Sequence, residues 1–180
     1  MADTGKIYFA SDFHLGLPTG APPVEREKKV VEWLNSVARD AKEIYLLGDV
    51  FDFWWEYKLV VPRGFTRFLG TTAAITDSGT PVHFFTGNHD MWIGDYLSSE
   101  CGVTIHTTPY TTILNGKKFH LAHGEGLGTK DKGYEILLAI FRNKFLRAMY
   151  SALHPSIGVG IGQRWSLSSR LGKGIKKEFL

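Results

Sequence analysis

Four short apolar runs divide the chain, and each of them ends in polar residues. The runs cover residues 6–11, 43–48, 81–86 and 118–122. Within them apolar side chains follow one another rather than alternating strictly with polar ones, which is typical of strands that are buried on both faces. The pattern therefore predicts four buried strands with polar residues at their carboxyl ends.

Segments that are predicted to be helical lie between the first three runs. Apolar residues recur at helical intervals, with charges between them, at Val30, Val31, Leu34, Val37, Ala38 and Ala41. A second helix is expected over residues 64–77, where the sequence Asp77-Ser78-Gly79 ends it. The order strand, helix, strand, helix, strand predicts an α/β fold with a mostly parallel sheet.

The chain changes character after the third run. Residues 103–106 and 110–114 predict shorter strands, and Asn115-Gly116 is a strong hairpin signal. The sheet is therefore expected to be mixed at this point. Residues 134–150 then predict a helix in which apolar and basic residues are interleaved.

Residues 154–162 contain Pro155 and three glycines, which we expect to break that helix. A final basic piece, also predicted to be helical, contains Arg164, Arg170, Lys173, Lys176 and Lys177.

Composition limits the possible functions. The 180 residues are 43% hydrophobic and 22% charged, as expected for a globular domain with its own core, and the net charge of +3 is too mild to argue nucleic-acid binding. The single cysteine, Cys101, excludes an intrachain disulfide and suits a reducing compartment. Because we find no signal-peptide pattern and no apolar stretch of about 18 residues, we expect a cytoplasmic protein that is soluble or attached to a membrane surface.

The polar clusters carry the candidate chemistry. Ligands of open α/β sheets bind beyond the carboxyl ends of the strands, so we expect the clusters to converge on one edge. Asp12 and His14, two apart in extended backbone, would point to the same side and bind one ion; the alternative is a strand end with a capping Asp. Asp49 can bridge two ions after a sharp turn at Gly48, or it can cap a turn.

The third cluster, Gly87-Asn88-His89-Asp90, is the most specific of the four. Asn88 can ligate through its carbonyl oxygen, and His89 can protonate a leaving oxygen or stabilise phosphoryl charge. Asp90 is expected to hold the His89 ring in one tautomer. The alternative is an Asn-containing turn.

His123 directly follows the fourth run, and the order of the three earlier clusters gives it weight as a ligand. Oxygen and imidazole ligands together suit manganese, iron or zinc better than calcium. Two such ions about 4 Å apart can clamp a phosphoryl group and activate a water. The remaining histidines have no comparable context and are interpreted as structural or surface residues: His83, His106, His120 and His154.

The motifs D-x-H, G-D, G-N-H-D and H-G, in this order over residues 7–125, resemble those of the calcineurin-like metallophosphoesterases. The resemblance implies an αββα sandwich of two mixed sheets with a two-metal site at its edge. Asp12 and His14 would bind one metal, Asp49 would bridge, and Asn88 and His123 would bind the other. His89 matches the catalytic histidine of the family.

A narrower resemblance is to the UDP-2,3-diacylglucosamine hydrolases within that family. It rests on the segments ASDFHLG (10–16), GDVFDFW (48–54), GNHDMW (87–92) and HGEGLGTKDKGY (123–134). It implies manganese-dependent hydrolysis of a pyrophosphate to lipid X and UMP, with Asn88, His89 and Asp131 contacting the substrate. Some members carry Arg where this chain has His89.

The same resemblance divides the chain into a core over residues 1–133 and a helical cap over residues 134–180. The cap would hold acyl chains against Leu137, Leu138, Ile140, Phe141, Phe145, Leu146 and Met149, although a helical apolar stripe is equally typical of core packing. Basic residues in 142–147 and 164–177 would face anionic lipid, or form a solvated face. The implied protein lies in the cytoplasm on the inner face of the inner membrane, with a lipid-nucleotide substrate, no nucleic acid and no obligate protein partner.

The sequence departs from the family pattern in one respect. The family has a later Gly-His-x-His motif, whereas the histidine after His123 is His154, followed by Pro155. We therefore expect a C-terminally truncated copy or a short form with an incomplete site. The competing functions are a general two-metal phosphoesterase acting on nucleotides or phosphoproteins, and a non-catalytic relative that only binds ligand.

Overall fold

The computed structural model describes residues 5–124, 139–141 and 143–172. A four-stranded sheet with strand order β1-β2-β3-β4 forms its centre, and all of its neighbouring strands are parallel. Its strands are β1 (Lys6–Ala10), β2 (Ala41–Leu47), β3 (Val82–Phe85) and β4 (Thr104–His106). The parallel α/β organisation is thus confirmed, and β1, β2 and β3 end at the same edge of the sheet.

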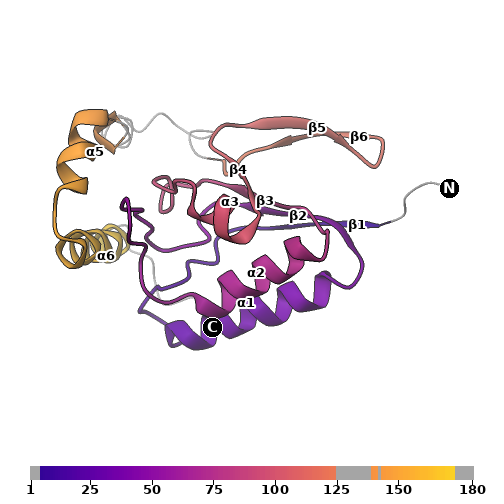
Figure 1. Ribbon diagram of the computed structural model, residues 1–180, viewed down its shortest axis with the longest axis horizontal. Coiled ribbons are helices and arrows are strands. Elements are labelled where there is room, and N and C mark those ends of the chain that lie inside the picture. Colours follow the sequence, from indigo (N-terminus) through magenta and orange to yellow (C-terminus); the bar gives the residue numbers. More distant parts are fainter. Residues whose placement is uncertain (1–4, 125–138, 142, 173–180) are drawn as a thin grey trace.

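Three helices follow the first three strands: α1 (Pro23–Val37), α2 (Thr66–Asp77) and α3 (Tyr96–Cys101). Figure 1 shows α1 and α2 side by side on one face of the sheet, where Leu34 and Phe68 are buried in the main core. α1 begins with a proline, whose fixed φ suits the first helical position. The helix ends at Val37 rather than extending to Ala41 as predicted, because Ala41 pairs with Lys6 at the start of β2.

The predicted hairpin is present as β5 (Tyr110–Leu114) and β6 (Lys117–Leu121), paired antiparallel. Asn115 and Gly116 both have positive φ, 47° and 76°, as tight hairpin turns favour. The expectation that the hairpin would make the sheet mixed was wrong. It forms a second sheet, because Leu114 and Leu121 pack face to face against Tyr45 and Phe85 of the first sheet.

Two further helices, α5 (Lys144–Ser151) and α6 (Pro155–Gly172), lie together at one end of the molecule (Figure 1). The continuous helix predicted over residues 134–150 is interrupted at Asn143, whose backbone is extended. The Asn143 side chain accepts hydrogen bonds from the amides of Phe145 and Leu146, so it caps α5 instead of continuing a helix. Among the described residues no helix has the length and apolar character needed to cross a membrane.

The predicted break before residues 154–162 is confirmed, because α5 ends at Ser151 and a new helix begins at Pro155, but the three glycines lie inside α6 rather than in the break. An added Cβ at Gly158 would overlap the hydroxyl of Tyr57, and one at Gly162 would overlap the ring of Phe53. These glycines, one helical turn apart, let α6 approach the loop that follows β2. Close packing there outweighs the low helix propensity of glycine.

The spacing between α6 and Phe53 can be tested with two glycine substitutions. We expect Gly162→Ala to lower the free energy of unfolding by about 1–3 kcal/mol, because the new methyl group overpacks against the ring. Gly160→Ala is the matched control, since nothing lies within 4 Å of the added Cβ. That substitution should stabilise the protein by about 0.5–1 kcal/mol through helix propensity. Urea unfolding measures both, and equal stability of the two variants would contradict the close approach.

Candidate metal centre

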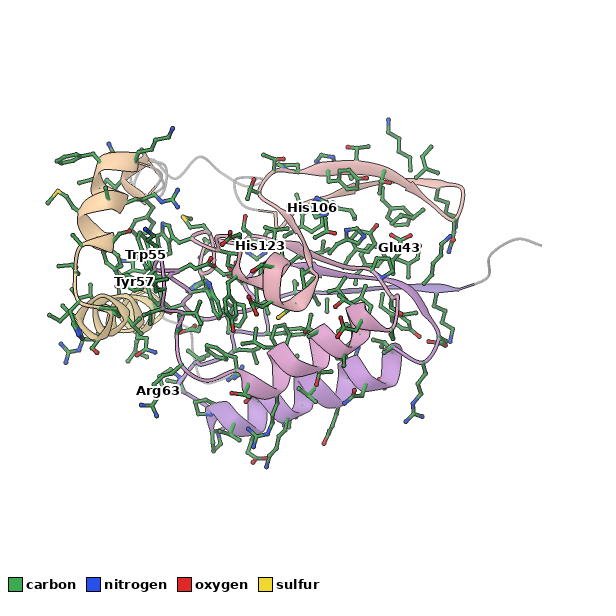
Figure 2. The ribbon with its side chains drawn as sticks, in the orientation of Figure 1. Glu43, Trp55, Tyr57, Arg63, His106 and His123 are labelled. Atoms are coloured by element: carbon green, nitrogen blue, oxygen red, sulfur yellow. The ribbon has the colours of Figure 1, made fainter. Side chains whose placement is uncertain are left out.

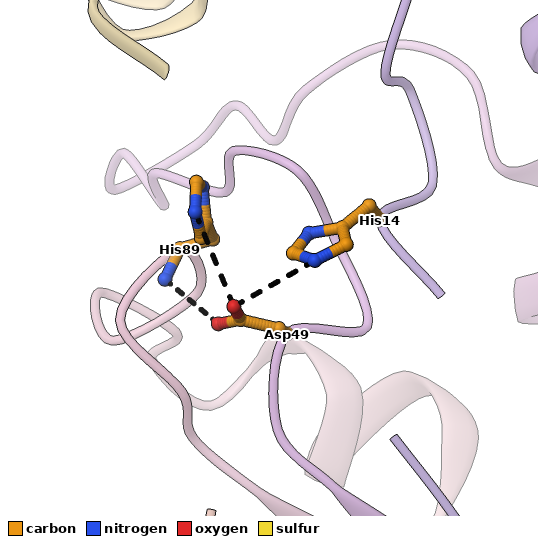
Figure 3. Close-up of side chains that lie close together, drawn as sticks. All are labelled: His14, Asp49 and His89. Carbon is orange, nitrogen blue, oxygen red and sulfur yellow. Dashed lines mark hydrogen bonds and ion pairs between the residues drawn. The ribbon is translucent and has the colours of Figure 1, made fainter. Parts of the chain in front are cut away.

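The carboxylate of Asp49, in the turn after β2, is the point at which the predicted site residues meet. Its Oδ2 lies 3.8 Å from Nε2 of His14, 4.0 Å from Nε2 of His89 and 3.5 Å from Nε2 of His123. Figure 3 shows the His14 and His89 rings converging on this carboxylate from separate loops. Side chains from the ends of β1, β2, β3 and β6 therefore gather at one edge, as the sequence predicted.

Strained backbone brings Asp12 and His14 to the site. Their φ angles are 57° and 45°, and that of Asp49 is 52°. The predicted extended backbone at Asp12 and His14 is thus wrong: both are left-handed, a conformation that costs about 1–3 kcal/mol in a residue other than glycine. Hydrogen bonds from the Asp12 amide to the Gly48 carbonyl (3.1 Å) and from the His14 amide to the Asp49 carbonyl (3.0 Å) hold the two loops together.

Two glycines allow these loops to approach each other. Gly48 has a φ of 87°, and a Cβ there would lie 2.5 Å from Nδ1 of His123. A Cβ at Gly87 would lie 2.6 Å from the backbone nitrogen of Asp49. The sharp turn predicted at Gly48 is confirmed, and both glycines also make room for the side chain or backbone of the neighbouring loop.

Burial and charge oppose each other at Asp49 and His123. Burial acts to raise the pKa of Asp49, but the neighbouring His123 and His89 rings outweigh it and hold that pKa below its usual range. Burial acts to lower the pKa of His123, but its contact with Asp49 raises it to about 9. The His123 Nδ1 lies 2.7 Å from the Leu47 carbonyl oxygen, so this nitrogen donates and Nε2 faces Asp49.

The arrangement of donors fits divalent ions. His14, Asp49 and His89 form one group of potential ligands, and Asp12, Asp49 and His123 form another. Ligands about 2.0–2.2 Å from one ion are at most about 4.4 Å apart, and the separations of 3.5–4.0 Å around Asp49 lie within that limit. The separations of 3.8 Å from His14 and 4.0 Å from His89 are too long for hydrogen bonds. Asp49 belongs to both groups, as a bridging carboxylate must.

The grouping differs from the predicted ligand sets in detail. Asp12 falls with His123 rather than with His14, although Oδ1 of Asp12 is only 3.8 Å from Nε2 of His14. His89, expected beside the ions, falls among the potential ligands. Asn88 is half-buried in the bend after β3. The assignment of ligands to individual ions therefore stays a prediction, and Asp131 lies outside the described residues.

Asp90 does not orient the His89 ring as predicted. It is fully buried, and its carboxylate accepts hydrogen bonds from the amides of Gly87, Val50 and Phe51 at 2.7, 2.8 and 3.3 Å. Burial raises its pKa to about 7. Asp90 instead ties the loop after β3 to the loop after β2, and the Asp52 carbonyl oxygen, 2.8 Å from Nδ1, holds the His89 ring.

Two residues of the site were not predicted. Asp52 is buried, and its Oδ1 lies 3.8 Å from Nδ1 of His14. Ser166 of α6 donates to Oδ2 of Asp52 at 2.9 Å. The spacing Asp49-x-x-Asp52 after a buried strand is a signal that could have drawn attention to Asp52. No local pattern marks Ser166, which is 114 residues from its partner.

An apolar cavity of about 290 Å³ lies under α5 and α6, and two of the residues that line it, Phe53 and Trp165, are the chain neighbours of Asp52 and Ser166. Figure 2 shows Trp55 and Tyr57 beside this helix pair, and Trp55 lines the cavity with Trp92 and Trp165. Of the predicted acyl-chain contacts, Ile140, Phe141 and Leu146 line the cavity. Phe145 and Met149 are instead 71% and 56% exposed. Leu137 and Leu138 lie outside the described residues.

Comparison with known proteins gives a consistent result. Residues 5–152 match the family described as calcineurin-like phosphoesterase. The chain is 47% identical over 166 residues to a protein of Porphyromonas gingivalis. The matched region covers 92% of this chain and 63% of that protein. It is 31% identical to a protein of Nitrosococcus oceani (87% of this chain, 61% of that protein) and 34% identical to one of Pseudomonas fluorescens (76% and 53%). All three are named UDP-2,3-diacylglucosamine hydrolase, and the chain spans less than two thirds of each.

Metal binding at this site should release protons. Because the pKa of His123 is raised to about 9, the ring is protonated at pH 7 and must lose a proton before it can bind an ion. Apparent Mn²⁺ affinity should therefore rise as the pH rises towards 9. Calorimetric titration with MnCl₂ in two buffers of different ionisation enthalpy measures the release. His123→Ala should weaken binding, whereas His120→Ala, on an exposed position of β6, should not. A binding heat independent of the buffer would contradict this prediction.

Proposed function

The chain belongs to the calcineurin-like phosphoesterase family, and on that premise we propose that it hydrolyses the pyrophosphate of UDP-2,3-diacylglucosamine to lipid X and UMP. The observation that carries the proposal is the apolar cavity beside the candidate metal centre. A substrate with a pyrophosphate at one end of a diacylated sugar needs both features side by side. The names of the similar proteins support the same substrate.

We propose that Asp12 and His14 hold one ion, Asn88 and His123 hold the other, and Asp49 bridges the two. The mixture of carboxylate, amide and imidazole donors suits manganese. When bound, the two ions supply charge that stabilises the transferred phosphoryl group, and they acidify the attacking water. Asp49 is suited to the bridging position because both of its oxygens are held: Oδ1 accepts from the His89 amide at 3.0 Å, and Oδ2 faces the three imidazoles.

His89 is proposed as the residue that protonates the leaving oxygen. Its Nδ1 is occupied by the Asp52 carbonyl oxygen, so Nε2 is the nitrogen turned towards the centre. A histidine held in this way presents one nitrogen for proton transfer. Asn88, His89 and Asp131 are proposed to contact the substrate. Asp90 contributes by fixing the loop that carries Asn88 and His89.

We propose that residues 134–180 form a cap on a core made by residues 1–133, with α5 and α6 as its described helices. Apolar side chains of these helices enclose the cavity together with Trp55 and Trp92, and the Trp92 indole N–H donates to the Phe141 carbonyl at 3.3 Å. Acyl chains would lie in this cavity. The sugar-linked phosphate would then point towards Asp49.

The outer face of the cap is proposed to contact an anionic membrane from the cytoplasmic side. Between residues 139 and 172 the sequence has five Lys or Arg residues and no Asp or Glu. Phe145 and Met149 of α5 and Ile157 of α6 are more than half exposed. Apolar side chains beside basic ones are typical of surfaces that bind anionic bilayers.

The reaction can be tested by measuring Mn²⁺-dependent release of UMP from UDP-2,3-diacylglucosamine. Loss of a residue that supports a metal ligand typically lowers activity roughly 10–100-fold. Asp49→Ala removes a ligand itself, so it should lower turnover by more than that. Asp95→Ala, at an exposed position, is the control and should behave like the unaltered chain. Far better turnover of soluble bis(p-nitrophenyl) phosphate would favour a general phosphoesterase. Mn²⁺ binding without hydrolysis of either compound would favour a binding role.

Membrane contact can be tested by cosedimentation with vesicles. Phe145→Glu combined with Met149→Glu should reduce binding to phosphatidylglycerol vesicles, because two charges replace exposed apolar contacts. Ile113→Glu is the matched control, since Ile113 is 72% exposed on the hairpin, away from the cap. Binding should weaken as salt is added and should be small on phosphatidylcholine. Equal loss in both variants would argue against a docking face on α5.

A further inference from the structure

Ser166 connects α6 to the candidate metal centre. The residue is fully buried, and its hydroxyl donates to Oδ2 of Asp52 at 2.9 Å. The hydroxyl oxygen of Ser166 also lies 3.4 Å from Nδ1 of His89. This serine is therefore the point at which a helix far along the chain reaches the loops that follow β2 and β3.

The hydrogen-bond directions around Ser166 are fixed by chemistry. The Asp52 carbonyl oxygen can only accept, so Nδ1 of His89, 2.8 Å away, carries the hydrogen. The buried Asp52 carboxylate accepts the Ser166 hydroxyl hydrogen, which turns a lone pair of Oγ towards the same Nδ1–H. The ring is left with Nε2 facing Asp49, at 4.0 Å from its Oδ2.

Asp52 extends this connection to a second imidazole. While its Oδ2 binds Ser166, its Oδ1 lies 3.8 Å from Nδ1 of His14. Asp52 is only 4% exposed, and a buried carboxylate requires hydrogen-bond donors. Removing the serine hydroxyl would take one donor away and allow the carboxylate to turn, with consequences for both rings.

We propose that Ser166 is a positioning residue: through Asp52 it fixes the His14 and His89 rings, so that the seating of α6 sets the geometry of the candidate metal centre. Trp165, its neighbour in the chain, lines the apolar cavity. The filling of the cavity and the orientation of the two imidazoles are thus linked, because Trp165 and Ser166 are adjacent residues of α6. The substrate part of this inference rests on the proposed function, whereas the metal-binding part does not.

The test compares Ser166→Ala with Ser168→Ala, which removes an exposed hydroxyl from the same helix. Supporting residues of metal ligands typically contribute about 10–100-fold to affinity or activity. We expect Mn²⁺ affinity, measured by calorimetry, to fall about tenfold in Ser166→Ala and to stay unchanged in Ser168→Ala. Turnover at saturating Mn²⁺ should fall in kcat, with little change in KM for the lipid substrate.

Two further variants separate positioning from packing. Ser166→Cys nearly keeps the size of the side chain but donates weakly, so it should behave like Ser166→Ala. In an Asp52→Asn background, Ser166→Ala should cause little additional loss, because the two residues act as one unit. Native-like activity and affinity in Ser166→Cys would overturn the proposal in favour of simple packing.

The same experiment distinguishes this inference from the proposed function. Ser166→Ala should also lower turnover of bis(p-nitrophenyl) phosphate, which needs no acyl cavity. A raised KM for the lipid substrate with unchanged kcat and unchanged Mn²⁺ affinity would mean that Ser166 only seats the helix, and would overturn the proposal. Failure of the unaltered chain to hydrolyse the lipid substrate would count against the proposed function, while the Mn²⁺ affinities would still decide the role of Ser166.

Discussion

The buried carboxylate of Asp49 is the group on which the architecture of the site depends. Three imidazoles from different loops face its Oδ2, and the amide of His89 binds its Oδ1. Burial alone would favour the neutral acid, yet the histidine rings keep the pKa of Asp49 low. A buried anion surrounded by imidazoles is electrostatically balanced by protons or by a cation, which is why this point can exchange protons for divalent ions.

The surrounding loops bring those groups together by adopting strained backbone conformations. Asp12, His14 and Asp49 are all left-handed, and glycines at 48 and 87 leave no space for a side chain. Such strain persists only where the surrounding structure enforces it. Here the parallel sheet anchors the ends of the loops, and the buried Asp90 binds amides on both sides of the gap.

The helix pair α5 and α6 gives the site its second feature, an apolar cavity next to a polar centre. Gly158 and Gly162 allow α6 to pack against Tyr57 and Phe53, and this close approach carries Ser166 to Asp52. Helix α6 therefore contributes both to the wall of the apolar cavity and to the hydrogen bonds around His89, the proposed catalytic histidine. This proximity is the structural basis for treating the helix pair and the metal centre as one functional unit.

The sequence by itself determined β1, β2 and β3, their parallel arrangement and the polar clusters at the strand ends, because continuous apolar runs and Gly-Asp turns are local signals. The prediction of a buried strand over residues 118–122 was wrong in one respect: β6 pairs antiparallel with β5 and is exposed over most of its length. It also indicated Asp12, His14, Asp49, Asn88, His89 and His123 as residues that would converge. Only the tertiary structure decided that Asp90 binds backbone amides, that the hairpin forms a separate sheet and that a helix runs through Gly158 and Gly162. It alone revealed Ser166 beside Asp52. These features depend on contacts between residues distant in the chain, and such contacts leave no pattern in the local order of side chains.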